Sequence, residues 1–299
     1  MTLPIAPGAE ARIAPAGLMF LAITSVSWGL NWPVMKHLLT EWPPLSARGL
    51  AGLAGGGLLA LLAVGRGQSL RVPPLQWPRL LLSAFLNVTV WMTLMGLALV
   101  RLPASEATVL AYTMPIWTML MAWPILGERM TLKRVLALLM AFAGIIALMG
   151  GNGFAAGTAK LPGVIMILGG AVAFGLGTVV AKGLPRSLPV LSSSALQICI
   201  GSVPVALAGL LFEHAHFEAL TGAGWAMLAY MALIAFCIAY FCWFAALERL
   251  PASVAAIGTM VVPVIGVIVS AVALHEPLGI GQIAALLFTL AGVVLATRS

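Results

Sequence analysis

Residues 101–105, RLPAS, recur unchanged as residues 249–253, and the correspondence continues beyond them. At the same offset of 148 residues, Pro115 corresponds to Pro263. Five consecutive identities followed by matched positions without a gap indicate an internal duplication, which composition alone rarely produces. The chain is therefore expected to contain two copies of one structural unit. The further matched pairs are Glu128 with Glu276 and Ala143-Gly144 with Ala291-Gly292.

The composition is that of a polytopic membrane protein. Of the 299 residues, 62% are hydrophobic and only 8% are charged, and the mean hydropathy is +1.11. A water-soluble protein could not cover so much apolar surface with so few charges. All eight acidic residues are glutamates, so chemistry built on aspartate pairs or on aspartate-held magnesium is excluded. A P-loop for ATP is excluded as well, because the chain has no GxxxxGK[ST] stretch.

Apolar runs recur along the whole chain. A helix needs roughly 20 residues to cross the hydrocarbon core, and the sequence contains ten runs of about that length. The connections between them are too short to form a soluble domain. We expect an all-α membrane protein of ten transmembrane helices, arranged as two inverted five-helix repeats around a central cavity. The expected spans are 17–36, 44–64, 79–100, 104–125, 132–149, 161–182, 190–212, 224–247, 251–273 and 278–297.

The distribution of basic residues predicts the orientation. With the N-terminus inside, eleven lysines and arginines fall on cytoplasmic segments, and four (Lys36, Arg48, Arg101 and Lys160) fall on the other side. Such a positive-inside bias predicts that both termini are cytoplasmic. Because each repeat has an odd number of spans, the second copy enters the membrane upside down. The expected organisation is a tail over 1–16, a first repeat over 17–149, a loop over 150–160 and a second, inverted repeat over 161–297.

The first apolar run is expected to be a spanning helix rather than a signal peptide, because it ends in Pro33 and Lys36 without a small-residue cleavage pattern. The two copies are expected to meet through residues 169–177 and the glycine-rich run Gly52–Gly57, since small residues let helix backbones approach closely in lipid. Cys199, Cys237 and Cys242 lie in apolar runs and are interpreted as small buried hydrophobes.

Several of these features together resemble a known family. They are the Trp28-Gly29 pair, the repeated Pro-Ala-Ser at 103–105 and 251–253, the prolines that follow, and a glutamate closing each paired helix. The chain resembles the drug/metabolite transporter superfamily, within it the EamA-type ten-helix permeases, and within those the YddG-type exporters of aromatic and other amino acids. The resemblance covers nearly the whole chain. It implies a bacterial inner-membrane secondary carrier with a cavity lined by both halves. The copies differ at His275, where the first has Gly127, and at Val254, where the first has Glu106.

Pro115 and Pro263 are the candidate hinge or gating residues. A proline within a helix has no N–H and frees the carbonyl four residues earlier, here those of Ala111 and Thr259. A carbonyl without a partner in lipid is costly, so it should face protein or a water-filled cavity. The alternative is a kink that only improves packing.

A second set of candidates combines aromatic rings with polar groups deep in the predicted spans. Buried amides should not face lipid, so Asn31 and Asn87 are expected to point inward together with the rings on the same helix faces. Such a cavity suits a small amphipathic solute, and the alternative for each residue is ordinary interhelical packing. Trp42, Trp77, Trp123 and Trp225 lie near span ends and are interpreted as an interfacial belt. The candidate substrate-binding residues are Trp28, Asn31, Trp32, Asn87, Trp91, Tyr112, Thr178, Tyr240, Trp243 and Met260.

The charged residues near span ends admit two interpretations each. Glu106 either complements a helix dipole or takes part in ion coupling. Glu128 and Glu276 either form loop-end ion pairs or act as folding determinants, or they carry protons, and His275 titrates near neutral pH if it is functional. Lys36 and Lys182 either extend to the membrane surface or attract a substrate carboxylate. His214-x-His216, flanked by Glu213 and Glu218, is the nearest approach to a metal site, and a solvated loop is the favoured interpretation.

The leading functional hypothesis is export of small amphipathic metabolites, above all neutral and aromatic amino acids, by alternating access. Two alternatives are a multidrug or quaternary-amine efflux permease and, from another class, a membrane-embedded enzyme. The first is disfavoured because the first span has no carboxylate to neutralise a cation. We expect no catalysis, no cofactor, no metal and no nucleic acid. The expected partners are the lipid bilayer and a small-molecule substrate, with the protein a monomer or weak homodimer in the inner membrane.

Overall fold

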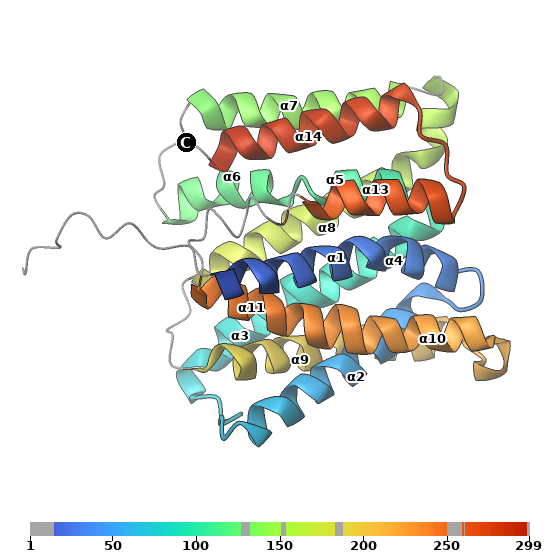
Figure 1. Ribbon diagram of the computed structural model, residues 1–299. Helices are drawn as coiled ribbons and strands as arrows, with labels where there is room; N and C mark the ends of the chain where they lie inside the picture. Colours follow the sequence, from blue (N-terminus) through green and yellow to red (C-terminus); the bar gives the residue numbers. More distant parts are fainter. Residues whose placement is uncertain are drawn as a thin grey trace, which may run out of the picture.

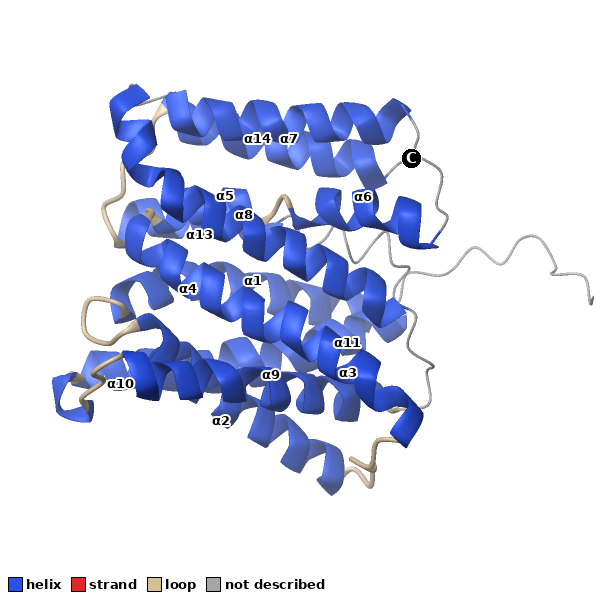
Figure 2. Ribbon diagram, turned by 180° about the vertical axis from the view of Figure 1, so that it is seen from behind, coloured by secondary structure: helices blue, strands red, loops and turns tan. Residues whose placement is uncertain are grey.

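The computed structural model describes residues 15–126, 132–150, 154–182, 188–249, 259 and 261–297. Within these ranges every regular element is helical, and the helices lie side by side with their connections gathered towards two ends of the bundle (Figure 1; Figure 2). In chain order they are α1 (Pro15–Leu38), α2 (Pro44–Gly65), η1 (Pro74–Gln76), α3 (Trp77–Ala84), η2 (Phe85–Val90), α4 (Trp91–Arg101), α5 (Ala104–Ala111), α6 (Met114–Leu126), α7 (Leu132–Gly150), α8 (Phe154–Lys182), α9 (Val190–Phe212), η3 (Phe217–Ala219), α10 (Gly222–Tyr230), η4 (Met231–Ile238), α11 (Ala239–Arg249), α13 (Val261–Ala273) and α14 (Ile280–Thr297).

Seven of the described helical runs are long and apolar enough to cross a membrane, and the longest is the 28-residue run Pro74–Arg101. Val261–Ala273 and Ile280–Gly292 are shorter apolar helices. The described helices overlap every range in which the sequence predicts a span. Residues 251–258 and residue 260, which belong to the ninth predicted span, lie outside the described part of the chain, as does residue 250 before it. The prediction of an all-helical membrane protein is confirmed for the described ranges.

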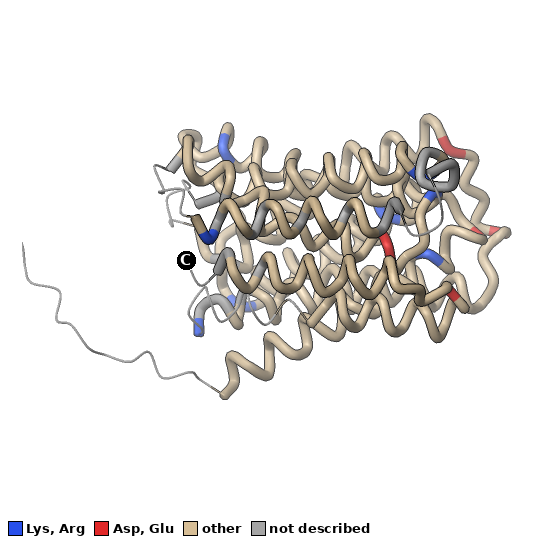
Figure 3. The backbone as a smooth tube through the Cα atoms, turned by 90° about the horizontal axis from the view of Figure 1, so that it is seen from above, with Lys and Arg blue, Asp and Glu red and all other residues tan. Residues whose placement is uncertain are grey.

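Charged residues lie towards the two ends of the helices, and the acidic ones gather towards one of them (Figure 3). We call this the acidic end; it comprises the connections 39–43, 102–103, 213–221 and 274–279, which carry Glu41, Glu213, Glu218 and Glu276. The arginines at 66, 71, 79 and 249 belong to the opposite end. These four arginines are among the basic residues from which the cytoplasmic side was predicted.

Small residues bring α2 against α9 and the π-helix η4. A Cβ atom added to Gly49 would lie 2.5 Å from the Cα of Ala206, and one added to Gly55 would lie 2.5 Å from the Cβ of Phe236. In lipid, such close packing holds helices together where no hydrophobic drive exists between them. The predicted contact of the run Gly52–Gly57 with the second half of the chain is therefore confirmed.

Glycines of α8 likewise allow close approaches, here to α6 and α4. A Cβ on Gly175 would lie 2.8 Å from the backbone nitrogen of Thr118 in α6, and one on Gly170 would lie 3.3 Å from the Trp91 ring. The predicted role of residues 169–177 as a contact between the two halves is confirmed by these approaches.

α1 lies in the middle of the bundle and contacts α11 and α13 (Figure 1). A Cβ on Gly29 would lie 2.6 Å from the Cγ2 of Ile265, so α1 and α13 approach closely at this point. The Tyr230 hydroxyl donates a 2.8 Å hydrogen bond to the carbonyl of Ser27. α1 is thus held by elements from the far part of the chain.

Two of the apolar runs contain a π-helical segment, η2 and η4. Under the 148-residue offset of the sequence repeat, residues 85–90 of η2 correspond to residues 233–238, which lie within η4. π-helical turns are rare and occur frequently at functional sites. Their matched positions give the duplication a counterpart in the backbone, and they direct attention to the residues around them.

We predict that Gly49→Ala lowers the free energy of unfolding by about 1–3 kcal/mol, because the new Cβ would meet the backbone of Ala206 rather than a side chain that can move. Gly57→Ala is the matched control in the same helix, since nothing lies within 4 Å of its added Cβ. That change is expected to raise stability by about 0.5–1 kcal/mol through helix propensity. Denaturation of both variants in detergent micelles tests the contact. Equal effects would contradict it.

Candidate functional site

An aromatic cluster lies where α1 meets η4 and α11. The Trp28 ring centroid is 5.3 Å from that of Tyr240, at 71°, and 5.8 Å from that of Trp243. The Trp28 indole N–H donates a 3.2 Å hydrogen bond to the carbonyl of Ala235 in η4. Edge-to-face contacts of this kind and a bonded indole hold the rings in fixed orientations. Three of the predicted substrate-binding residues are therefore brought together.

A second aromatic pair lies between α4 and α8. The centroids of Trp91 and Phe174 are 5.5 Å apart in an edge-on arrangement. One turn before Trp91, in η2, the Asn87 amide donates to the hydroxyl of Ser83 at 3.3 Å. Asn87 also faces Gly177, where an added Cβ would overlap its carbonyl oxygen. Among the described residues no ring contact joins this pair to the Trp28 cluster, so the predicted residues form two groups.

The remaining predicted residues occupy different surroundings. Trp32 is buried in the hydrophobic core, with 3% of its surface exposed. Thr178 donates its hydroxyl to the carbonyl of Phe174, one turn earlier in its own helix. Tyr112 lies partly buried at the end of α5 and packs against the core. Met260 lies outside the described residues.

The predicted hinge at Pro115 coincides with a break in the helix. α5 ends at Ala111, Tyr112 and Thr113 form a turn, and α6 begins at Met114. Because Pro115 has no N–H, it cannot donate to the carbonyl of Ala111, and the helix is interrupted rather than bent. Pro263 likewise lies in the first turn of α13, and Thr259 is the nearest described residue before that helix.

Arg48 is a buried charge that the sequence did not reveal. Its position falls within the expected span 44–64, near the end where its charge was counted on the non-cytoplasmic side, and it lies in the second turn of α2 with only 2% of its surface exposed. Its stem crosses α4 at Gly96, where an added Cβ would lie 3.1 Å from the Arg48 Cδ. Its guanidinium donates to the sulfur of Met35 at 2.7 Å and lies within electrostatic range of Tyr240 in α11. The count of basic residues could not reveal this burial, because the partners come from three other helices.

Four buried polar atoms have no hydrogen-bond partner among the described residues: Asn31 Oδ1, Arg48 Nε, Asn87 Oδ1 and Ser270 Oγ. Buried polar groups are nearly always paired, so each exception calls for an explanation. Two of the four, Asn31 and Asn87, are the amides that the sequence analysis placed in the cavity. Polar atoms without partners in an apolar bundle are candidates for binding a ligand.

Glutamate carboxylates close helix N-termini at the acidic end. Glu276 accepts hydrogen bonds from the backbone N–H of Ala104 at 2.6 Å and from that of Ser105 at 2.9 Å, and the Ser105 hydroxyl also donates to it. Glu213 accepts from the N–H groups of Leu45 and Ser46 in the same way at 2.9 and 2.7 Å. Each carboxylate satisfies amides that a helix leaves unpaired and complements its dipole. Glu276 was expected to be a loop-end ion pair or folding determinant, or else a proton carrier, and its bonds to the start of α5 agree with a folding determinant.

The residue before Glu276 adopts an unusual backbone conformation. His275 has a φ of 53°, in the left-handed region that glycine adopts most easily. The corresponding residue of the first copy is Gly127. His275 thus holds a left-handed backbone conformation at the position where the first copy has glycine, the residue that adopts this conformation most easily. Glu128 and Gly127 themselves lie outside the described residues.

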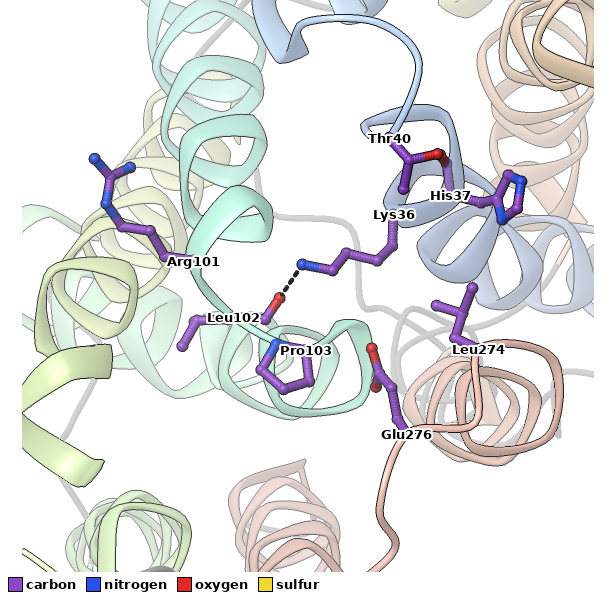
Figure 4. Close-up of a pocket in the computed structure, with 8 residues that line it drawn as sticks. All are labelled: Lys36, His37, Thr40, Arg101, Leu102, Pro103, Leu274 and Glu276. Carbon is purple, nitrogen blue, oxygen red and sulfur yellow. Dashed lines mark hydrogen bonds between the residues drawn. The ribbon is translucent and has the colours of Figure 1, made fainter. Parts of the chain in front are cut away.

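A pocket of about 410 Å³ opens at the acidic end beside this turn (Figure 4). The Lys36 ammonium donates to the carbonyls of Leu99 and Leu102, the latter at 2.9 Å, where α4 ends. Arg101 points away from the other side chains that line the pocket (Figure 4). Lys36 therefore extends to the helix end, and it closes α4 while Glu276 closes α5. The side chain of Lys182 is outside the description. The lining residues are Lys36, His37, Thr40, Arg101, Leu102, Pro103, Leu274 and Glu276.

Glu106 takes part in a buried polar network. It is 3% exposed, and its Oε1 lies 2.7 Å from the ammonium of Lys160, which is itself 23% exposed. The amide of Gln282 in α14 donates to the same oxygen at 3.2 Å. The residue lies in the first turn of α5, as its expected role at a helix dipole requires. Its main partner, however, is a cation from α8, which ties α5 to both α8 and α14.

The described residues contain no group of three His, Cys, Asp or Glu side chains that could hold a metal ion. His214 and His216 are exposed, and Glu213 between α9 and α10 binds the start of α2 instead. The favoured interpretation of this segment as a solvated loop agrees with that exposure. The three cysteines are free.

Known proteins resemble the chain over nearly its whole length. The model of the EamA-like transporter family matches residues 15–150 and again residues 161–298. YvbV, an uncharacterized transporter of Bacillus subtilis (strain 168), is 32% identical over 277 residues, which are 93% of this chain and 90% of that protein. Protein PecM of Dickeya dadantii (strain 3937) is 23% identical over 90% of this chain and 88% of its own length. A crystal structure with 23% identity matches with a TM-score of 0.68, over 93% of this chain and 96% of the other.

We predict that Glu276→Ala lowers the free energy of unfolding by about 1–2 kcal/mol, because it leaves the first N–H groups of α5 without acceptors. Glu218→Ala is the control at the same end, since Glu218 is exposed, and its effect is expected to stay within about 0.5 kcal/mol. Thermal and denaturant unfolding in detergent measures both. A loss for Glu218→Ala as large as that for Glu276→Ala would show that general charge, and not the cap, is responsible.

A double-mutant cycle at Glu106 and Lys160 is expected to give a coupling free energy of about 1–3 kcal/mol, since one partner is buried and the other is only partly exposed. Glu106→Leu alone leaves the ammonium without its partner, and Lys160→Met alone leaves the buried carboxylate. The double variant removes both and should regain stability relative to the sum of the single changes. Additive losses would show that the pair contributes nothing by itself.

Proposed function

The chain belongs to the EamA-like transporter family, and from this premise we propose that it is a secondary carrier that exports small amphipathic metabolites, foremost neutral and aromatic amino acids. The observation that carries the proposal is the combination of fixed aromatic rings with buried polar atoms that have no partner. Rings accommodate an apolar side chain, and the polar atoms accommodate a charged or hydrogen-bonding head.

The carrier works by alternating access. Ten spans form two inverted five-helix repeats, with both termini in the cytoplasm of a bacterial cell and the inner membrane around the bundle. The two halves rock about a central site that includes the predicted substrate-binding residues, and the chain bends at Pro115 and at Pro263. Support comes from the two matches to the family model and from the break between α5 and α6, since interrupted helices are typical of carrier binding sites. The protein acts as a monomer or weak homodimer.

Export of multidrug or quaternary-amine substrates is the less favoured alternative, because a cationic ligand calls for an available carboxylate. Among the described glutamates, Glu213 and Glu276 bind helix N-termini, and Glu106 pairs with Lys160. Glu41 accepts hydrogen bonds from the N–H and hydroxyl of Thr221. The family and its relatives are transporters, which points away from an enzyme.

The test is counterflow of radiolabelled tryptophan, methionine and threonine in proteoliposomes. Saturable uptake above that of empty vesicles is expected for at least one of them. Trp28→Ala should raise KM about tenfold or more through the loss of an aromatic contact, and Trp77→Ala, at an exposed span end, should leave KM unchanged. Lack of saturable uptake of all three would refute amino acid transport. A resistance screen in an efflux-deficient strain then addresses the multidrug alternative.

A further inference from the structure

Two residues that carry such unpartnered polar atoms, Asn31 of α1 and Arg48 of α2, lie at one face of α1. Arg48 reaches from α2 to the sulfur of Met35, and Asn31 is one helical turn before Met35 on the same face of α1. One turn of helix rises about 5.4 Å, so the position of Asn31 on α1 adjoins the point where the Arg48 guanidinium reaches α1. The guanidinium offers an unused donor, Nε, and the carboxamide offers an unused acceptor, Oδ1.

The guanidinium of Arg48 lacks a compensating charge. A thioether sulfur is a weak acceptor, and no carboxylate of the described residues pairs with Arg48. A buried charge without a partner is strongly destabilising, and core packing alone would favour an apolar residue here. An ionisable side chain within a membrane bundle therefore indicates a functional site whose partner is supplied from elsewhere.

We propose that Arg48 and Asn31 bind the zwitterionic head of a free α-amino acid, the guanidinium taking the carboxylate and the Asn31 oxygen accepting from the ammonium. The inference rests on the proposed function, and it names the substrate class by its head group. Tyr240, which packs on Trp28 with its ring centroid 5.3 Å away, belongs to the aromatic cluster that receives the side chain.

Access to this site requires movement of α1. The Arg48 Nε and Asn31 Oδ1 atoms are sealed from solvent in this conformation. A zwitterion reaches them when α1 separates from α2 and α4, which alternating access provides. The site is then exposed in one state of the carrier and closed in the other.

The experiment compares tryptophan with two analogues, tryptamine, which lacks the carboxylate, and indole-3-propionate, which lacks the ammonium. Each competes with radiolabelled tryptophan in proteoliposome counterflow. The wild-type protein should prefer tryptophan to both analogues by about tenfold or more, because charge-assisted hydrogen bonds in a desolvated site are strong. Arg48→Gln should lose the preference over tryptamine and retain the preference over indole-3-propionate. Asn31→Leu should show the reverse pattern.

The controls separate ligand recognition from a structural role. Arg48→Lys keeps the charge and should retain part of the preference over tryptamine, and Arg71→Gln, at an exposed position of the opposite end, should change neither preference. Because Arg48→Gln removes an uncompensated buried charge, its thermal midpoint should not fall below that of the wild type. A large fall would indicate that Arg48 also has a structural role, and the selectivity of Asn31→Leu then decides: an unchanged preference of Asn31→Leu for tryptophan over indole-3-propionate would overturn the proposal.

The outcomes separate an error in the zwitterion site from an error in the proposed function. If wild-type protein takes up tryptophan and the variants keep both preferences, the zwitterion site is wrong and the proposed function stands. If the wild-type protein shows no tryptophan counterflow, the result counts against both. Opposite losses of selectivity in Arg48→Gln and Asn31→Leu would establish the assignment of each head-group charge to its residue.

Discussion

Every helix in a lipid bilayer must satisfy the backbone groups at its ends, and the acidic end of this bundle does so with charged side chains from other parts of the chain. Glu276 from the connection before α14 closes the start of α5, and Lys36 from α1 closes the end of α4. The short break at residues 102–103 is thus bracketed by an anion and a cation, each with the sign that the adjacent helix dipole favours. The duplicated stretch RLPAS contains the residues that these two charges hold.

The helical architecture could be predicted from the sequence, because apolar runs and the spacing of prolines and glycines are local signals. The contacts of Gly52–Gly57 and residues 169–177 were predicted for the same reason, since small residues on one face have few other uses in lipid. The partners of charged side chains were not predictable. Trp42, assigned to the membrane surface, is 3% exposed and donates its indole N–H to the carbonyl of His216, which is 174 residues away. The burial of Arg48 against Met35 was missed for a similar reason.

The π-helices are a further feature that periodicity does not reveal, because one inserted residue per turn leaves the apolar pattern intact over a short segment. η2 carries Asn87, and η4 carries Ala235, whose carbonyl binds the Trp28 indole. Asn87 and Ala235 are related by the 148-residue offset. The two candidate groups, around Trp91 and around Trp28, therefore adjoin corresponding irregularities in the two copies. The residues that could distinguish substrates differ between the copies, although the backbone that positions them is shared.

The carboxylates at the acidic end also constrain the order in which the protein can be completed during synthesis. The first amides of α2 bind Glu213, 168 residues further along the chain, and those of α5 bind Glu276, 172 residues further along. Thr221 at the start of α10, in turn, binds Glu41 from the connection after α1. The first turns of α2 and α5 consequently remain open to interfacial water until the second half has been inserted. The emerging chain can place its early helices in the bilayer, but its acidic end closes only after the segments that carry Glu213 and Glu276 have been added.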